Sequence, residues 1–356
     1  MTRRRQPEIE PGVLLVDKPA GPSSHAVVDW IRWVFRGAAV GHCGTLDPAA
    51  TGLLVVVLGA ATRVAAHLSE ADKAYRARIV VGCSTTTVDA EGETVERMAC
   101  EPGDAARAVE VVRGLLGAHE LAPPQFSAVK VGGVAAHVRA RAAARGDGEP
   151  EALAPRPMTV HAVDGVCATF DPAEAIVCID AVLDVSKGTY IRSLAEVVGR
   201  RLGRPAHLGS LRRLRSGSST LDDPRAMGPL EATALPTDGG KPRWRIRPRA
   251  VTGVEADASR EEQGAWLERH RVPLHEAWPL PWVELPAGDA AQPILDRLLN
   301  GQRLELAALG ASAAGLGGRI GIGRSAPGGA FFVARVESGE VRPERMVVRP
   351  NASAAA

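Results

Sequence analysis

One aspartate lies in a setting that can hold a carboxylate in a fixed place. Residues 41–54 read GHCGTLDPAATGLL, so Asp47 lies between Gly44 and Gly52, and is followed directly by Pro48. Glycine permits tight turns and proline fixes its own φ, so the pattern predicts one acid on a stiff loop at the edge of a core. Leu-Asp-Pro is also a common turn sequence, and alone it fits either a turn former or a reacting group.

Other side chains that could share a reaction with this acid are few. The 356 residues contain only two tyrosines, Tyr75 and Tyr190, and Arg192 follows the second one closely. A guanidinium beside a carboxylate favours its ionised form and can bind it through two N–H groups. From Arg192 to Ser219 the chain has seven arginines and one acid. Such a bias favours a phosphate-bearing partner, with a solvated basic face as the alternative.

The elements that must position these residues alternate between short strands and a few helices. Gly12–Asp17 and Leu53–Leu58 are typical of buried strands, and Tyr75–Val81 alternates as a half-exposed strand does. Ser23 or Ser24 can cap a helix that follows. Further strands are predicted over 126–131, 158–170, 175–185 and 208–215, and further helices over 104–116 and 190–202. The fold class is therefore α+β with a mostly antiparallel central sheet and flanking helices, plus a small C-terminal β-rich module.

The composition is typical of a globular chain, and no secretory signal is expected. Hydrophobic residues make up 45% and charged residues 24%, and the net charge is only +2. The apolar run near the N-terminus, Leu53–Leu58, is far below the ~20 residues of a membrane helix. The arginines at positions 3–5 precede no apolar signal region, so a cytoplasmic location is expected. The five cysteines form no C-x-x-C pair and are expected to be reduced thiols.

No sequence motif indicates a cofactor. Residues 315–321 (GLGGRIG) are one residue off a dinucleotide-binding spacing, but no βαβ unit surrounds them, so a glycine turn is expected. The chain has no phosphate-binding P-loop, no H-E-x-x-H and no EF-hand pattern. Neither a metal nor an organic cofactor is predicted.

Six stretches, in one order along the chain, resemble motifs of the TruB family of tRNA pseudouridine-55 synthases. Residues 41–54 resemble motif II of that family, which contains the aspartate. The other five are residues 17–24 (DKPAGPSS), 72–76 (DKAYR), 123–130 (PPQFSAVK), 186–194 (SKGTYIRSL) and 211–214 (LRRL). Together they cover roughly residues 12 to 216.

The resemblance implies an isomerase that turns uridine 55 of the tRNA T-loop into pseudouridine. It assigns Asp47 as the nucleophile, which could attack the sugar C1′ or the uracil C6. It places Arg192 beside Asp47, Tyr75 on the flipped uracil as the candidate for removing the C5 proton, and Tyr190 near the glycosidic bond.

Further residues are assigned to substrate binding and support by the same resemblance. His42 assists base flipping, with an ordinary turn histidine as the alternative, and Leu211 packs on the base, where a plain core leucine fits equally well. Lys18 and Pro19 would brace the loop of Asp47. Residues 132–156 resemble a thumb-like insertion that grips the T-loop. The remaining residues expected to bind RNA are Arg139, Arg141, Arg212 and Arg213.

The chain departs from the family pattern at two places, since His137 and Phe126 stand where the family usually has tyrosine. We expect a basic tail (1–11), a catalytic domain (12–283), a PUA-like RNA-binding module (284–350) and a tail (351–356). The stretch from about Pro224 to Pro286 is rich in Pro, Trp and Arg and is expected to be a loop or insertion rather than core, with a Pro/Trp/Arg-rich insert at about 235–265. Its basic segment Lys241–Arg249 is expected either to contact RNA or to be a disordered insert.

The expected partner is free tRNA, with no membrane, no guide RNA and a monomeric enzyme. The nearest rival is a guide-RNA-dependent synthase subunit of the H/ACA type. A rival from another class is a tRNA chaperone without catalysis.

Overall fold

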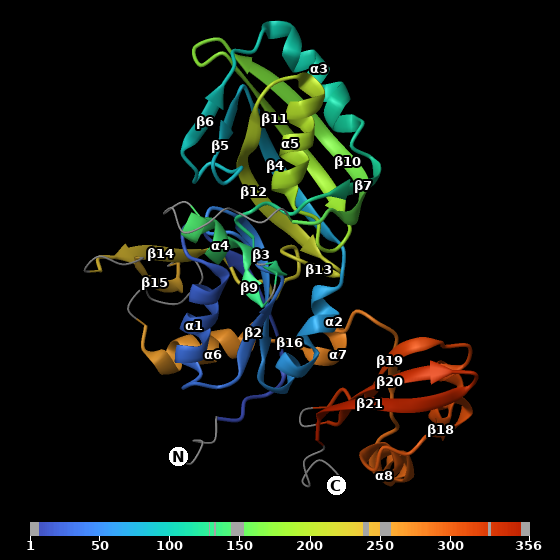
Figure 1. Cartoon of the computed structure of the whole chain (residues 1–356). Helices are drawn as coiled ribbons and strands as arrows, with labels where there is room; N and C mark the ends of the chain where they lie inside the picture. The colour runs from blue at the N-terminus through green and yellow to red at the C-terminus, as the bar shows by residue number, and fades with distance from the viewer. Residues whose placement is uncertain are drawn as a thin grey trace. The chain divides into compact units, whose positions relative to one another are not determined.

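We describe the protein from a computed structural model. It describes residues 7–127, 129–131, 133–143, 153–237, 242–249, 258–326 and 329–349. The chain forms two compact units (Figure 1). The first unit comprises Met1–Asp47, Leu53–Ala71 and Gly217–Ala356, and the second unit comprises Pro48–Gly52 and Asp72–Ser216.

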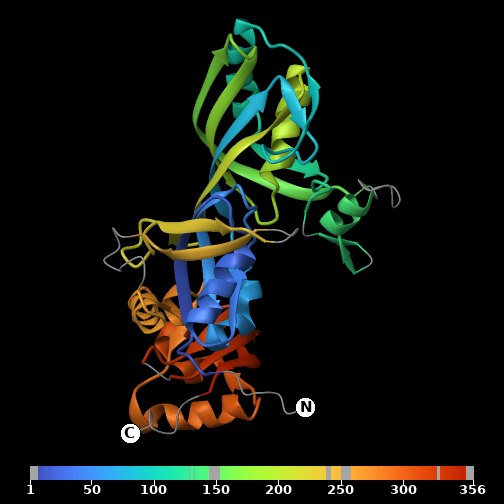
Figure 2. The ribbon, with the colours of Figure 1, turned by 90° about the vertical axis from the view of Figure 1, so that its left-hand side faces the viewer.

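The second unit is built on an antiparallel sheet (Figure 1, Figure 2). Its strands lie in the spatial order β12 (Ala206–Ser216), β4 (Lys73–Val81), β11 (Ile176–Val185), β10 (Arg156–Asp171) and β7 (Gly117–Leu121). Alternate residues of β4 are buried, which is the half-exposed pattern that the sequence predicts. β3 (Thr51–Leu58) begins in this unit, where Thr51 and Gly52 pair in parallel with β12.

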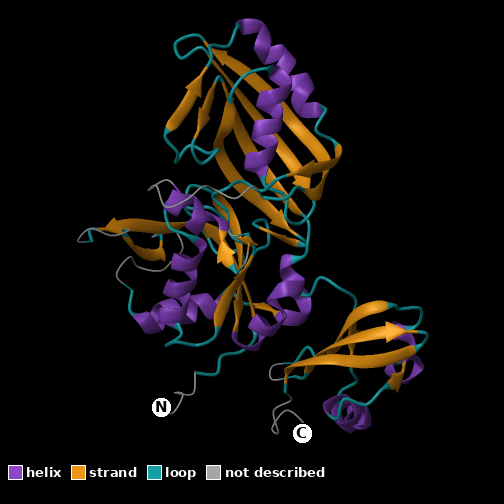
Figure 3. Ribbon diagram, in the orientation of Figure 1, coloured by secondary structure: helices purple, strands orange, loops and turns teal. Residues whose placement is uncertain are grey.

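Two helices cover one face of this sheet (Figure 3). α5 (Ile191–Leu202) packs on β12 and β4, and α3 (Pro102–Arg113) packs on β10 and β11. The smaller elements of this unit are β5 (Cys83–Thr85), β6 (Thr94–Arg97), β8 (Lys130–Val131), β9 (Val134–Ala135) and α4 (Ala136–Ala143). The strand expected over 126–131 is therefore wrong for its first part, because Phe126 and Ser127 lie in a bend.

The first unit contains further strands of the same ten-stranded sheet, and several of its helices pack on them. The strand order is β16 (Val272–Pro273), β1 (Gly12–Lys18), β3 and β2 (Val40–Cys43). α1 (Ser24–Val34) is capped by Ser23, whose hydroxyl accepts a hydrogen bond from the amide of Ala26 at 3.1 Å. The remaining short elements before the C-terminal sheet are the 3-10 helix Gly59–Val64, α2 (Ala65–Ser69), β13 (Ser219–Thr220) and α7 (Leu274–Ala277).

The region expected to be loop contains regular structure and part of the core. β14 (Leu230–Leu235) pairs with β15 (Arg243–Pro248), and α6 (Arg260–Arg269) follows. Trp266 of α6 is 1% exposed, so the expectation of loop rather than core is wrong here. A helix whose outer face is charged can still bury one tryptophan, and average composition hides it.

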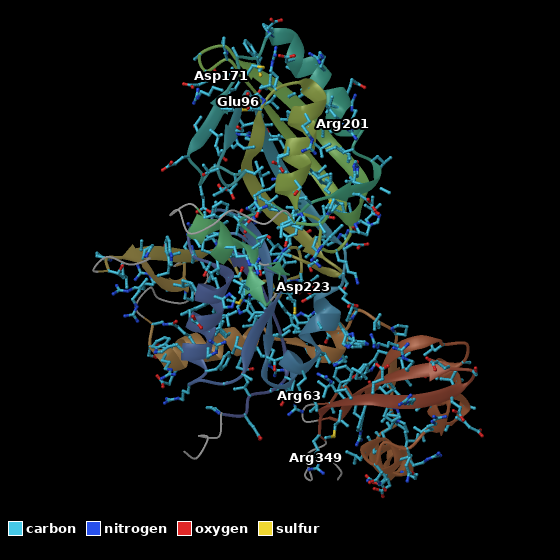
Figure 4. All side chains as sticks on the ribbon, in the orientation of Figure 1. Arg63, Glu96, Asp171, Arg201, Asp223 and Arg349 are labelled. Carbon is cyan, nitrogen blue, oxygen red and sulfur yellow. The ribbon has the colours of Figure 1, made fainter. Side chains whose placement is uncertain are left out.

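A five-stranded sheet forms the C-terminal β-rich module, as the sequence predicts. Its strand order is β17 (Trp282–Glu284), β19 (Gly318–Gly323), β20 (Phe331–Glu337), β21 (Glu340–Val348) and β18 (Leu304–Glu305). Its helices are α8 (Gln292–Leu299) and the 3-10 turns Gly288–Ala291, Leu306–Leu309 and Ala311–Ala313. Arg63, labelled in Figure 4, donates to the carbonyl of Val347 at 2.9 Å. The predicted domain boundary at 284 and the PUA-like character stay predictions.

Over the residues that the structure describes, no helix is both long and apolar enough to cross a membrane.

Candidate active site

The loop of Asp47 is fixed through the residue before it. The Leu46 amide donates to the Ser24 hydroxyl oxygen at 2.8 Å, and the same hydroxyl donates to the Leu46 carbonyl at 3.0 Å. Ser24 is fully buried and Leu46 is 3% exposed. One side chain thus satisfies both backbone groups of Leu46, while Asp47 itself is half-buried.

Steric crowding, and not only backbone flexibility, requires glycine at position 52. Its φ is +95°, and a β-carbon built on it would lie 2.3 Å from the carbonyl oxygen of Arg213. Any other residue here would collide with the backbone of β12. The glycine therefore lets β3 approach β12 five residues after Asp47.

The lysine of the N-terminal motif is buried and ties down its own loop. The Lys18 ammonium donates to the carbonyls of Pro19 and Pro22 at 2.9 and 2.8 Å, and Lys18 is fully buried. The loop it holds leads directly to Ser23 and Ser24. These contacts support the bracing role predicted for Lys18 and Pro19.

In the second unit, Tyr75 and Leu211 lie on one face of the sheet. Tyr75 on β4 pairs with Arg213 on β12, and Ala77 pairs with Leu211, so residues two apart share a face. Tyr75 is 8% exposed and Arg213 is 1% exposed. Arg212 pairs with Arg76 on the opposite face. The two arginines that the sequence groups together thus point to different sides of the sheet.

The guanidinium of Arg192 is buried at the start of α5. Tyr190 is the N-cap residue of that helix, and Arg192 is 4% exposed. The Arg192 guanidinium donates to the Phe126 carbonyl at 3.0 Å and to the Thr87 carbonyl at 3.2 Å. Phe126, where the family usually has tyrosine, contributes a backbone carbonyl here.

Asp89 is a residue that sequence reasoning missed. Its Oδ2 atom lies 3.6 Å from Nη1 of Arg192, and its side chain is only 13% exposed. Its other oxygen accepts hydrogen bonds from the Thr87 hydroxyl and from the Glu91 amide. The preceding Val88 has φ of +60°, a strained value for a β-branched residue, in the turn that presents this carboxylate. No local spacing links Asp89 to Arg192, so only the fold reveals the pair.

The other predicted residues lie on separate elements. His42 on β2 is half-buried, and its ring lies edge-on to that of His25 with centroids 5.2 Å apart. Arg139 is half-buried on α4. Arg141 and His137 belong to the same helix, but their side chains are outside the described part, as are residues 144–152 of the predicted thumb.

The predicted catalytic residues are divided between the two units. Asp47 ends a segment of the first unit, whereas Tyr75, Tyr190, Arg192 and Leu211 belong to the second. The predicted pairing of Asp47 with Arg192 stays a prediction. Within the described ranges, no group of three or more His, Cys, Asp or Glu side chains is arranged to hold a metal ion.

Comparisons with known proteins agree on one family. Residues 32–191 match the family described as TruB family pseudouridylate synthase (N terminal domain). The tRNA pseudouridine synthase B of Thermobifida fusca is 46% identical over 229 residues, which are 63% of this chain and 76% of that protein. The protein of the same name from Roseobacter denitrificans is 42% identical over 234 residues, which are 66% of this chain and 74% of that one.

A solved structure extends the likeness of fold over nearly the whole chain. The structure titled as a Cbf5-Nop10-Gar1 complex matches with a TM-score of 0.57 and 22% identity, covering 95% of this chain and 85% of that chain. This confirms the predicted fold class, and at that identity it carries no more than the fold.

Proposed function

This chain belongs to the TruB family of pseudouridylate synthases, and we propose that it isomerises uridine 55 in the T-loop of tRNA. It is an enzyme that converts uridine to pseudouridine in tRNA, as its relatives named tRNA pseudouridine synthase B indicate. The single observation that carries the position-specific proposal is the Asp47 loop, in which a family motif and a buried brace coincide.

The reaction needs one nucleophile and no redox step. Asp47 attacks C1′ of the ribose or C6 of the uracil, and the N1–C1′ glycosidic bond breaks. The uracil turns, a bond forms between C1′ and C5, and the carboxylate leaves. The proton on C5 is removed and a proton is added at N1, so the product is an isomer of the substrate. We assign Tyr75 to face the base, and it is our candidate for removing the C5 proton.

Arg192 supplies the cation that this carboxylate needs. A guanidinium held by two backbone carbonyls and by Asp89 keeps one orientation and pays little further ordering entropy when substrate binds. Beside Asp47 it would keep the carboxylate ionised in a site from which RNA excludes water. Tyr190, at the N-cap of the same helix, would contact the sugar near the glycosidic bond.

The uridine must leave its stack to react, and the remaining residues serve that step. We assign His42 to assisting the flip and Leu211 to packing on the flipped base. Arg139, Arg141 and Arg212 would bind phosphates around the T-loop. Arg213, by contrast, is 1% exposed, so we expect it to act from within the sheet rather than on a phosphate.

Asp47→Asn tests the assignment. We expect release of tritium from the C5 position of labelled tRNA to fall at least about 10³-fold, because an amide cannot replace the nucleophile. Asp29→Asn is the matched control, since it removes an exposed carboxylate of α1 that lies in the same unit. Substantial turnover by Asp47→Asn would overturn the assignment.

The enzyme is proposed to act alone in the cytoplasm, as a monomer and without a guide. Purified protein given only a tRNA transcript should form pseudouridine. If activity required a guide RNA and added proteins, the H/ACA-type rival would be correct. If the wild-type protein helped tRNA to fold but formed no pseudouridine, the chaperone alternative would be correct.

A further inference from the structure

The hairpin of β14 and β15 has two chemically different faces. Residues directly opposite each other in an antiparallel pair lie on the same side. One side carries the pairs Leu230 with Pro248, Ala232 with Ile246 and Ala234 with Trp244, and the other carries Glu231 with Arg247, Thr233 with Arg245 and Leu235 with Arg243. The hairpin thus has one apolar side and one side rich in arginine.

The apolar side anchors the hairpin to the first unit. Leu230 and Ile246 are 3% and 5% exposed, and β15 packs beside α1 (Figure 1, Figure 2). A β-carbon built on Gly21 would lie 2.4 Å from ring atom Cη2 of Trp244, so the indole rests directly on the Gly21 backbone. The position of the hairpin is therefore set by packing.

This anchor lies on the loop that braces the catalytic aspartate. Gly21 belongs to the loop held by Lys18, and Ser24 at its end holds Leu46, next to Asp47. The hairpin is thus connected to the Asp47 loop by a short series of direct contacts.

The outer side is rich in positive charge. Arg247 and Arg249 lie 3.5 and 3.8 Å from a single acid, Glu231. Arg243 and Arg245 are exposed, and no ion pair or hydrogen bond is recorded for their side chains within the described part of the chain. Four arginines therefore line one side of the hairpin, and two of them, Arg243 and Arg245, are exposed at its outer end.

We propose that this arginine face (Arg243, Arg245, Arg247 and Arg249) binds backbone phosphates of the tRNA substrate. The hairpin lies outside residues 32–191, which match the model of the family's N-terminal domain. Guanidinium groups bind phosphate through paired N–H donors. Arginines alternating along one face of a strand recur about every 6.6 Å, which presents them to one continuous polyanion.

The inference rests on the proposed function, and Arg243→Ala/Arg245→Ala tests it separately. Binding of full-length tRNA would be measured over a series of KCl concentrations. Each lost phosphate contact makes the negative slope of log K against log salt less steep by about 0.8. The slope of the double variant should therefore be less steep by about 1.6, which is equivalent to about 40-fold in affinity at 0.1 M salt.

Arg107→Ala/Arg113→Ala on α3 is the matched control. It removes the same net charge from exposed positions whose arginines already pair with acids. We expect its salt slope to stay close to that of the wild-type protein. Urea unfolding checks that the double variant still folds, and Arg243→Gln/Arg245→Gln repeats the test if the alanine variant does not.

The two ideas can fail independently. Wild-type protein that makes no pseudouridine in tRNA would refute the proposed function alone. An active protein whose salt slope and tRNA affinity are unchanged by Arg243→Ala/Arg245→Ala would refute the arginine face, leaving those arginines to guard a strand edge. Loss of binding to phosphatidylserine vesicles without loss of tRNA affinity would also overturn it.

Discussion

Replacing Ser24 by alanine should disable the enzyme by releasing the loop of Asp47. The hydroxyl of this fully buried residue is bonded to both the amide and the carbonyl of Leu46. Removing it leaves two buried backbone groups without that partner, at about 1–3 kcal/mol each. If only about 2 kcal/mol is expressed in the position of the loop, turnover falls about 30-fold.

The neighbouring Ser23→Ala is the control that separates stability from positioning. Ser23 caps the same helix through the Ala26 amide, and its loss costs about 1 kcal/mol of stability. Among the described residues, the Ser23 side chain forms no hydrogen bond with the Asp47 loop. Both variants should unfold at lower urea concentration than the wild-type protein, with Ser24→Ala the lower of the two.

The assay is single-turnover tritium release at saturating tRNA, beside urea unfolding and tRNA binding. We expect Ser24→Ala to lower the rate of the chemical step with little change in affinity, because Ser24 is fully buried. Ser23→Ala should retain nearly the wild-type rate. If the two variants lose stability but turn over at the same rate, the hydroxyl supports only the fold and the reasoning is wrong.

Two further predictions concern the second unit. Asp89→Asn should lower turnover about 10- to 100-fold with tRNA binding largely kept, because a buried guanidinium loses the carboxylate 3.6 Å away that orients it; comparing kcat with KM checks this. A hydrogen bond from the Glu101 amide, aided by Arg204 and Arg107 against the effect of burial, lowers the pKa of Asp104 in the capping box of α3. The ionised carboxylate therefore stabilises the fold above the ordinary Asp pKa of about 3.9, and Asp104→Ala should unfold more easily than the wild-type protein at pH 7. The urea midpoints of the wild-type protein and the variant should converge as the pH falls below about 4. A constant gap between them would contradict this account.

Many of the strands and helices could be predicted because they depend on the pattern of neighbouring residues. Buried strands such as Leu53–Leu58, the alternation of Tyr75–Val81 and the cap at Ser23 each follow from a few neighbouring residues. For the β14 and β15 hairpin and for α6, the sequence predicts loop instead, since their region is rich in proline and arginine. Ser259 followed by Glu262 is a capping-box signal that could have revealed α6.

The contacts that hold the site could not be predicted in this way. Ser24 meets Leu46 across 22 residues, and Arg192 meets Thr87 across 105. Such pairs depend on how strands are ordered in each sheet, and no periodicity encodes that order. A motif indicates which residues are functional, but it does not predict the hydrogen-bond partner of each residue.

Three buried polar side chains indicate how this protein keeps its loops in place. Lys18, Ser24 and Arg192 are at most 4% exposed, and each is bonded to backbone groups of a loop rather than only to another side chain. Apolar residues of similar size would cost less to bury. A loop, however, has no ladder partners for its amides and carbonyls, so an apolar replacement would leave those groups unsatisfied and the loop free to move. Burying these polar groups costs free energy, but it fixes the loops before RNA binds. A reaction that depends on the position of one carboxylate requires such fixed loops.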